Sequence, residues 1–225
     1  MYPVQFHRER PYKQPVFRKK NRMLRYIDLI QNPRRFLALT GYTVDEFQAL
    51  LSFFRVRFQA YVARFTLEGK PRQNRTYSTY KNSTFPTMED KLLFILNYMK
   101  TYAIQQTQAQ LFDIQQSQAN QWIHLLLPLD KQALADCGER PARKNEDMNL
   151  DADKAGLFVH DGTERPINRP QDPEEQRLYY SGKQKKHTIK NDLVIDEPCK
   201  TRFLSETVEG KKNDKRLADE SGYGV

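Results

Sequence analysis

The spacing of the hydrophobic residues changes once along this chain, and the change limits the folds open to it. Up to about residue 134, apolar residues recur at the three- and four-residue intervals of amphipathic helices. From about residue 155 onward, short runs rich in Val, Ile, Phe and Thr are separated by segments carrying Gly, Pro or Asp, which is typical of strands. We therefore predict an α+β chain, with an all-helical domain over residues 23–149 and an α/β domain over residues 150–225.

The charge and the cysteine content limit which partners this protein can bind and in which cellular compartment it can reside. The 37 Lys and Arg outnumber the 28 Asp and Glu, for a net charge of +9, which favours a polyanionic partner such as nucleic acid. The two cysteines, Cys137 and Cys199, form no CxxC pair, which argues against a zinc module or a disulfide scaffold. No apolar run approaches the roughly 20 residues of a membrane helix, and the N-terminus lacks a signal-peptide pattern, so we predict a soluble, cytoplasmic protein.

Residues 1–22 carry seven Lys or Arg against one Glu, together with three prolines. This composition predicts an irregular basic arm. Such an arm can lie along DNA phosphates or remain a solvated tail, and the sequence favours neither reading.

Two helix starts are marked by capping residues. Thr43 and Glu46 have the spacing of a capping box, and Thr87 can cap a later helix with Asp90 three residues on. The first of these helices carries a stripe that we assign to core packing: Phe47, Leu50, Leu51, Phe54, Phe58, Tyr61, Val62 and Phe65. A polar linker over residues 69–84 follows it.

From Thr87 to about Leu134 the pattern predicts three helices with short connections, the last of them bent or ended at Pro128. The short middle helix and the tight connection after it match a helix-turn-helix, in which the third helix reads DNA. Its early polar positions could hydrogen-bond base edges or phosphates, and these candidates are Gln116, Ser117, Asn120 and Gln121. A plain three-helix bundle is the alternative, since the start of the third helix carries no Arg or Lys.

Asp161-Gly162 ends a short apolar run and allows two interpretations. An Asp-Gly pair is a strong hairpin signal, but the residues that follow include Pro166, Pro170 and Pro173, which central strands tolerate poorly. We therefore expect Asp161 at the C-terminal end of a strand, where ligand sites collect on open sheets, beside a glycine that permits a close approach. One carboxylate can begin a Mg²⁺ site but cannot complete it.

Further strands are predicted over residues 185–196 and 201–210, followed by a helix that starts near Asn213 or Asp214. Residues 160–196, "HDGTERPINRPQDPEEQRLYYSGKQKKHTIKNDLVID", and the later "FLSETVEGKKNDKRLADE" resemble the catalytic domain of the insertion-sequence transposases known as DDE superfamily endonucleases. Upstream, "LTGYTVDEFQALL", "ERPAR" and the helices after residue 87 are similar to the helix-turn-helix region that precedes that domain. The resemblance runs from about residue 35 to residue 222.

The resemblance implies an RNase H-like fold in which three carboxylates hold two divalent ions, Mg²⁺ or Mn²⁺, for cleavage and strand transfer at double-stranded transposon ends. Asp161 matches the family's first catalytic aspartate. Asp214 matches a recurrent aspartate that is not the family's second catalytic one; it is a candidate metal ligand, although its place at a helix start is a sufficient explanation for it. The basic strand pair would face DNA phosphates or be simply solvated, and its residues are Lys183, Lys185, Lys186, His187 and Lys190. Glu164 and Arg165 either order the site or pair with each other.

The family's second catalytic aspartate and its glutamate would lie beyond Val225, so we expect a truncated or frameshifted transposase that binds transposon terminal repeats without independent cleavage. The family commonly assembles as homo-oligomers on paired ends. A non-catalytic helix-turn-helix regulator is the alternative, and a basic RNA-binding protein is a weaker one, because no RRM-type or KH-type signature is visible.

Overall fold

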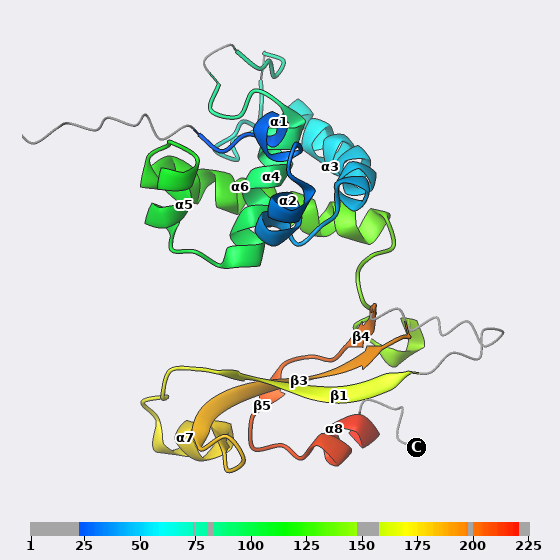
Figure 1. Cartoon of the computed structure of the whole chain (residues 1–225). Helices are drawn as coiled ribbons and strands as arrows, with labels where there is room; N and C mark the ends of the chain where they lie inside the picture. The colour runs from blue at the N-terminus through cyan, green and yellow to red at the C-terminus, as the bar shows by residue number, and fades with distance from the viewer. Residues whose placement is uncertain (1–22, 74, 81–82, 148–157, 198–199, 221–225) are drawn as a thin grey trace, which may run out of the picture. The chain divides into compact units, whose positions relative to one another are not determined.

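The computed structural model describes residues 23–73, 75–80, 83–147, 158–197 and 200–220. The predicted basic arm, residues 1–22, and Cys199 lie outside these ranges. The chain divides into two compact units, Met1–Asp136 and Cys137–Val225, which we describe one at a time (Figure 1). The first is helical and the second is built on an antiparallel sheet, so the chain is α+β.

The helical unit contains six α-helices among its described residues: α1 (Tyr26–Leu29), α2 (Pro33–Thr40), α3 (Val44–Arg64), α4 (Met88–Thr101), α5 (Gln105–Leu111) and α6 (Gln116–Asp136). The capping box that the sequence predicts for α3 is present, because Glu46 N donates to Thr43 Oγ1 at 3.3 Å and Thr43 N donates to Glu46 Oε2 at 2.7 Å. Thr87 caps α4 through a 3.1 Å bond from Asp90 N. Pro128 lies inside α6 and does not end it.

Aromatic side chains fill the core of this unit. Phe85, Phe94, Phe112 and Trp122 form one cluster, with ring centroids 4.9–5.9 Å apart in the contacting pairs. The predicted stripe of α3 is buried except for Tyr61, which is half-buried, and Phe65, which is exposed because it stands at the end of the helix. Among the described residues, no helix is long and apolar enough to cross a membrane.

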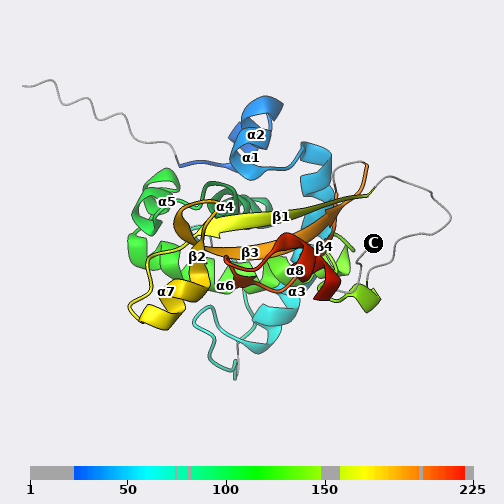
Figure 2. The same ribbon diagram turned by 90° about the horizontal axis from the view of Figure 1, so that it is seen from below.

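The sheet unit contains β1 (Val159–Pro166), α7 (Pro173–Tyr179), β2 (Tyr180–Ser181), β3 (Lys186–Ile195), β4 (Thr201–Leu204), β5 (Val208–Glu209) and α8 (Asp214–Glu220). A 3-10 turn, Asn145–Asp147, precedes it. β3 is the centre of the sheet and pairs antiparallel with each of the other strands. Figure 2 shows β2 at one end of β3 and β4 at the other.

The expected end of the first strand at Asp161 is wrong. β1 continues five residues further, to Pro166, and pairs with β3 from Val159↔Ile195 to Pro166↔Thr188. Proline is tolerated because, among the described strands, β1 pairs on one side only, with β3, and because Pro166 is its last residue. Asp161 is therefore an interior residue of an edge strand, and Asp161-Gly162 is not a hairpin turn.

The later elements follow the sequence pattern more closely. The predicted strand over residues 185–196 is β3, and the run 201–210 divides into β4 and β5. The predicted helix is α8, and Asn213 Oδ1 accepts from Lys215 N at 2.9 Å at its start. The sequence reading missed α7, which Asp172 caps by accepting from the backbone N–H groups of Glu174 and Glu175.

Candidate functional site

The connection between α5 and α6 has the geometry of a helix-turn-helix. Asp113, in the turn, adopts φ +51°, a left-handed conformation that reverses the chain sharply. The buried small side chains Ala109 and Ala119, one on each helix, allow the two backbones to approach closely. Gln115 N–H donates to Gln118 Oε1 at 3.1 Å and so caps the start of α6. Trp122 and Ile123, on the other side of α6, are buried.

The first turns of α6 present a polar surface. Gln116, Ser117 and Gln121 are exposed and Asn120 is half-exposed. These four side chains stand on one helix that is anchored by its apolar face, so they are held in fixed relation to one another. Amide and hydroxyl groups arranged in this way can donate to and accept from base edges.

The basic residues of the sheet unit divide into two groups. Lys183, Lys185 and Lys186 are exposed in and beside the β2–β3 turn, where Lys185 has φ +52°. Their ammonium groups are available to phosphates. Lys190 differs, because only 4 % of the residue is exposed and its ammonium is surrounded by acceptors. The Lys190 ammonium is therefore not available to a DNA phosphate.

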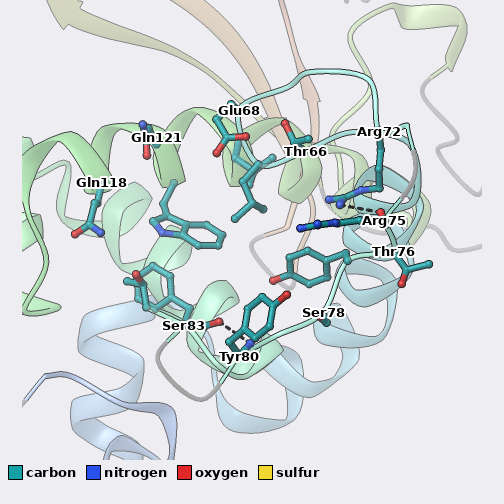
Figure 3. Close-up of a pocket in the computed structure, with 16 residues that line it drawn as sticks. Thr66, Glu68, Arg72, Arg75, Thr76, Ser78, Tyr80, Ser83, Gln118 and Gln121 are labelled. Atoms are coloured by element: carbon teal, nitrogen blue, oxygen red, sulfur yellow. Dashed lines mark hydrogen bonds between the residues drawn. The ribbon is translucent and has the colours of Figure 1, made fainter.

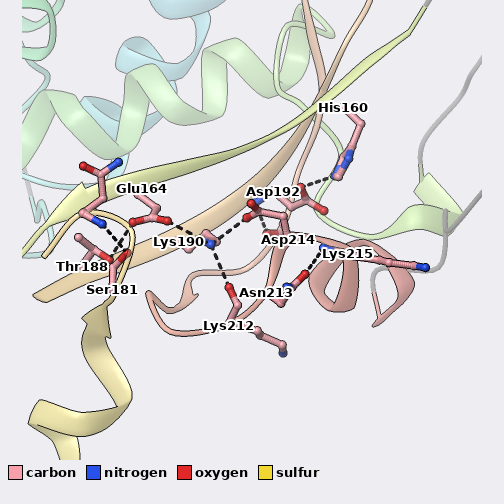
Figure 4. A network of polar contacts seen from close by, with 12 residues as sticks. His160, Glu164, Ser181, Thr188, Lys190, Asp192, Lys212, Asn213, Asp214 and Lys215 are labelled. Atoms are coloured by element: carbon pink, nitrogen blue, oxygen red, sulfur yellow. Dashed lines mark hydrogen bonds and ion pairs between the residues drawn. The ribbon is translucent and has the colours of Figure 1, made fainter. Parts of the chain in front are cut away.

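The Lys190 ammonium joins three elements on one face of the sheet (Figure 4). It donates to Asp214 Oδ1 at 2.8 Å and to the Lys212 carbonyl at 2.9 Å, and it lies 3.2 Å from Glu164 Oε1. Burial lowers the pKa of Lys190, but Asp214 and Glu164 outweigh burial and the pKa is raised. Burial likewise raises the pKa of Glu164, but hydrogen bonds from Ser181 and Lys190 outweigh it and the pKa is lowered. Both groups are therefore charged at neutral pH.

Gly162 makes room for this arrangement. A Cβ built on Gly162 would lie 2.6 Å from Asp214 Oδ1 and 3.2 Å from its Cγ. The close approach that the sequence predicts at Gly162 is thus made by a side chain of this chain, Asp214. Asp214 also stands at the first position of α8, so it serves both a helix start and an ion pair.

Asp161 lies on the opposite face of the sheet from this network. Paired residues of an antiparallel ladder point to the same side, and successive residues alternate. Gly162↔Asp192 and Glu164↔Lys190 therefore face Asp214, whereas Asp161↔Leu193 and Thr163↔Asn191 face the other way. Asp161 is exposed, and no side chain among the described residues is hydrogen-bonded to its carboxylate.

The described residues do not fit a two-metal centre. The two candidate ligands, Asp161 and Asp214, are on opposite faces, and an oxygen of Asp214 is bound to the Lys190 ammonium. Within the described ranges, no group of three His, Cys, Asp or Glu side chains is placed to hold a metal ion. No catalytic step can be derived through a metal from these residues.

The same alternation separates Glu164 from Arg165. Glu164 pairs with Lys190 on one face, while Arg165 donates to Asn191 Oδ1 on the other, so they do not pair with each other. Sequence reasoning missed the side-chain contact between His160 Nε2 and the fully buried carboxylate of Asp192, because the partners are 32 residues apart. It also missed a pocket beside α6, whose walls include linker residues (Figure 3).

Comparison with protein families gives two matches in order along the chain. Residues 87–136 match the family described as helix-turn-helix of DDE superfamily endonuclease. Residues 160–224 match the family described as DDE superfamily endonuclease. No curated protein matches the chain, and no solved structure does. The first match spans α4, α5 and α6, and the second spans the described sheet from His160 onward.

Proposed function

This chain belongs to the DDE superfamily transposases that carry a helix-turn-helix region before the endonuclease domain, and on that basis we propose that it binds duplex DNA at transposon terminal repeats with α6 in the major groove. The observation that carries the proposal is the polar first half of α6, held by a buried apolar face and reached through a sharp turn. The net charge of +9 supplies the attraction to phosphates that α6 itself does not.

Within this proposal, Asn120 and Gln121 read base edges, because amide side chains can bond adenine with two hydrogen bonds. Gln116 and Ser117, nearer the helix start, contact the phosphate backbone. Lys183, Lys185 and Lys186 contact phosphates from the sheet unit. Several copies of the chain would act on paired ends.

We assign to the sheet unit an RNase H-like fold, and to Asp161 the first carboxylate of its nuclease centre. The superfamily generally uses divalent metals, and Asp161 offers an exposed carboxylate on an edge strand. Asp214 has a structural role instead, since its Oδ1 accepts a hydrogen bond from the Lys190 ammonium on the opposite face of the sheet. The nuclease role of Asp161 therefore requires carboxylates other than Asp214. A non-catalytic DNA-binding regulator is the second candidate, favoured by the helix-turn-helix being complete in the described residues.

The first experiment selects bound duplexes from a random library with the full chain and measures affinities for the selected sequence. Asn120→Ala is expected to weaken binding about tenfold and to relax preference at one position, because a bidentate base contact contributes about 1–3 kcal/mol. Gln132→Ala, an exposed amide later on the same helix, is the matched control and should bind as the wild type does. Equal losses in both variants, or selection without any preferred sequence, would contradict base reading by α6.

A second experiment separates the two candidate functions. Asp161→Asn should leave affinity for the selected duplex unchanged, because Asp161 lies outside the helix-turn-helix. Any divalent-metal-dependent cleavage of that duplex should disappear in the variant. Cleavage that survives Asp161→Asn would exclude Asp161 from the nuclease centre, and absence of cleavage in the wild type with intact binding would favour the regulator.

A further inference from the structure

A pocket lies beside the proposed reading helix, and of its lining residues only Gln121 has a role in the proposed duplex reading. It has a volume of about 450 Å³, which is within the range of small-molecule sites. One wall is α6, through Gln118, Gln121 and Trp122, and the facing wall is the linker between α3 and α4. Figure 3 shows Gln118 and Gln121 on one side of the pocket, with Arg72 and Arg75 across from them.

Aromatic rings from both walls border this space. Tyr77 is fixed by an edge contact with Phe58, at a centroid distance of 5.6 Å, and Tyr80 is 70 % exposed. Trp122 packs edge-on against Phe85, at a centroid distance of 5.2 Å. Trp122 also lines the pocket, and 9 % of this residue remains exposed. Flat rings at the edge of a nucleic-acid-binding helix offer stacking surfaces for bases, whatever the sequence.

The two arginines of the linker have different tasks. Arg72 is committed to the fold, because it donates to the carbonyl oxygens of Val62, Phe65 and Arg75 at 2.8–3.1 Å. Those three bonds hold the linker against the end of α3. Arg75 is exposed, and no described residue accepts a hydrogen bond from its side chain. Its guanidinium is therefore able to meet a phosphate or stack on a base.

Glu68 sets the polarity of the pocket rim. A hydrogen bond from the Thr66 side chain is the largest cause that lowers the pKa of Glu68, so its carboxylate is charged at neutral pH. A carboxylate accepts from the exocyclic amino group of adenine, cytosine or guanine but repels phosphate. Gln118 and Gln121 add amide donors and acceptors on the opposite wall. The lining of the pocket thus combines partners for base edges, Glu68, Gln118 and Gln121, with the Arg75 guanidinium as a partner for a phosphate.

We propose that this pocket binds one unpaired nucleobase of a DNA strand that leaves the duplex next to α6. The inference rests on the proposed DNA-binding function, and it adds a preference for DNA that is partly single-stranded. Duplex DNA alone does not explain the arrangement, because a paired base cannot reach aromatic faces without leaving its stack.

The chain's one tryptophan, Trp122, makes the test direct, since a stacked base changes its fluorescence. The full chain is titrated with a blunt duplex of mixed sequence, the same duplex with a single-stranded adenine-rich tail, the tail oligonucleotide alone, and deoxyadenosine monophosphate. We expect the tailed duplex to bind about tenfold more tightly than the blunt one, because stacking of one base provides a gain of that size. The tailed duplex should also quench the fluorescence of Trp122 more strongly. Free nucleotide should bind at least about tenfold more weakly than the tail.

Variants assign the effect to the pocket. Tyr80→Ala should lose the preference for the tail while keeping blunt-duplex affinity, and Tyr80→Phe should keep both, because the ring stacks without its hydroxyl. Tyr102→Ala, which removes a tyrosine that is 84 % exposed and does not line the pocket, is the control. Circular dichroism establishes that each variant is folded.

The outcomes separate this inference from the proposed function. Quenching that depends on the tail and is lost in Tyr80→Ala supports the inference, even if the blunt duplex does not bind. Failure of the blunt duplex to bind would count only against the proposed duplex reading. Equal affinity and equal quenching with blunt and tailed duplexes would overturn the inference while leaving duplex binding intact. Free nucleotide that binds as tightly as the tail would overturn its assignment to a DNA strand.

Discussion

Asp130 is a buried carboxylate on α6 for which no described residue provides a hydrogen bond. Burial raises the pKa of Asp130 from 3.8 to about 7. Between these values the folded state keeps a proton that the unfolded state has lost, so the stability of the helical unit falls as pH rises from about 4 to about 7. The carboxylate is fully charged and the cost is complete above that window.

Asp130→Asn should remove this pH dependence and stabilise the helical unit at about pH 8 by roughly 1–3 kcal/mol, because the amide carries no charge. Urea unfolding followed through Trp122 fluorescence, at about pH 5 and about pH 8, measures the change. Asp136→Asn is the comparison. A hydrogen bond from Arg57 lowers the pKa of Asp136, so removing this carboxylate should change the stability in the opposite direction, as a loss. A variant with the wild-type slope between the two pH values would show that Asp130 is not the titrating group.

Gly162 tests how closely α8 approaches the sheet. Gly162→Ala should destabilise the sheet unit by about 1–3 kcal/mol, since the new methyl would overlap Asp214 Oδ1 and push this carboxylate away from the Lys190 ammonium. Hydrogen exchange of β1 and β3 peptides in urea measures the loss. Gly182→Ala is the control, as nothing lies within 4 Å of the added carbon. The double variant with Asp214→Ala should regain part of the stability, and failure to regain any would mean that the clash is elsewhere.

At the scale of elements, the Lys190 ammonium links β1, β3 and the start of α8. Lys190→Met should cost about 3 kcal/mol or more, because it leaves Glu164, with 9 % of its side chain exposed, as a buried charge without a partner. Adding Glu164→Gln should recover much of the loss, as measured by exchange of β3 peptides. Two losses that simply add would indicate that the ion pair is not what holds these strands.

The elements that the sequence predicted best are those whose signals are local. Helix starts are marked by capping residues that lie within four residues of one another, at Thr43 with Glu46 and at Thr87. The apolar stripe of α3 recurs at the helical period along its whole length. The end of β1 was misjudged because tolerance of Pro166 depends on β1 being an edge strand, a property of the whole sheet.

The candidate site was predictable only in part, for the same reason. Alternation along one strand puts Asp161 and Gly162 on opposite sides, but the face that Asp214 occupies depends on how α8 returns to the sheet. The burial of Lys190 cannot be read from a strand rich in lysine. The pocket beside α6 joins residues about 40 apart in sequence, so no local pattern marks it, although "RTYSTY" in the linker combines arginine with aromatic rings.

At the scale of the whole molecule, the two units differ in what they bury. The helical unit buries Phe36, Phe47, Phe54, Phe94 and Phe112 completely. Among the described residues of the sheet unit, the buried apolar side chains are Val194, Phe203 and Leu217, and its other buried side chains are polar or charged. Because apolar burial stabilises by about 25 cal/mol per Å² and buried polar groups contribute little net, the sheet unit should be the less stable one.

We therefore predict that urea unfolds the sheet unit first in the full chain. Pulsed hydrogen exchange should show peptides of β1 and β3 losing protection at a lower urea concentration than peptides of α3 and α4. Trp122 fluorescence, which reports on the helical unit, should change only in the second transition. Asp130→Asn should then shift only that second transition, and Lys190→Met only the first. One transition shared by all peptides and shifted by both substitutions would show that the two units unfold as a single cooperative body, whatever their separate cores suggest.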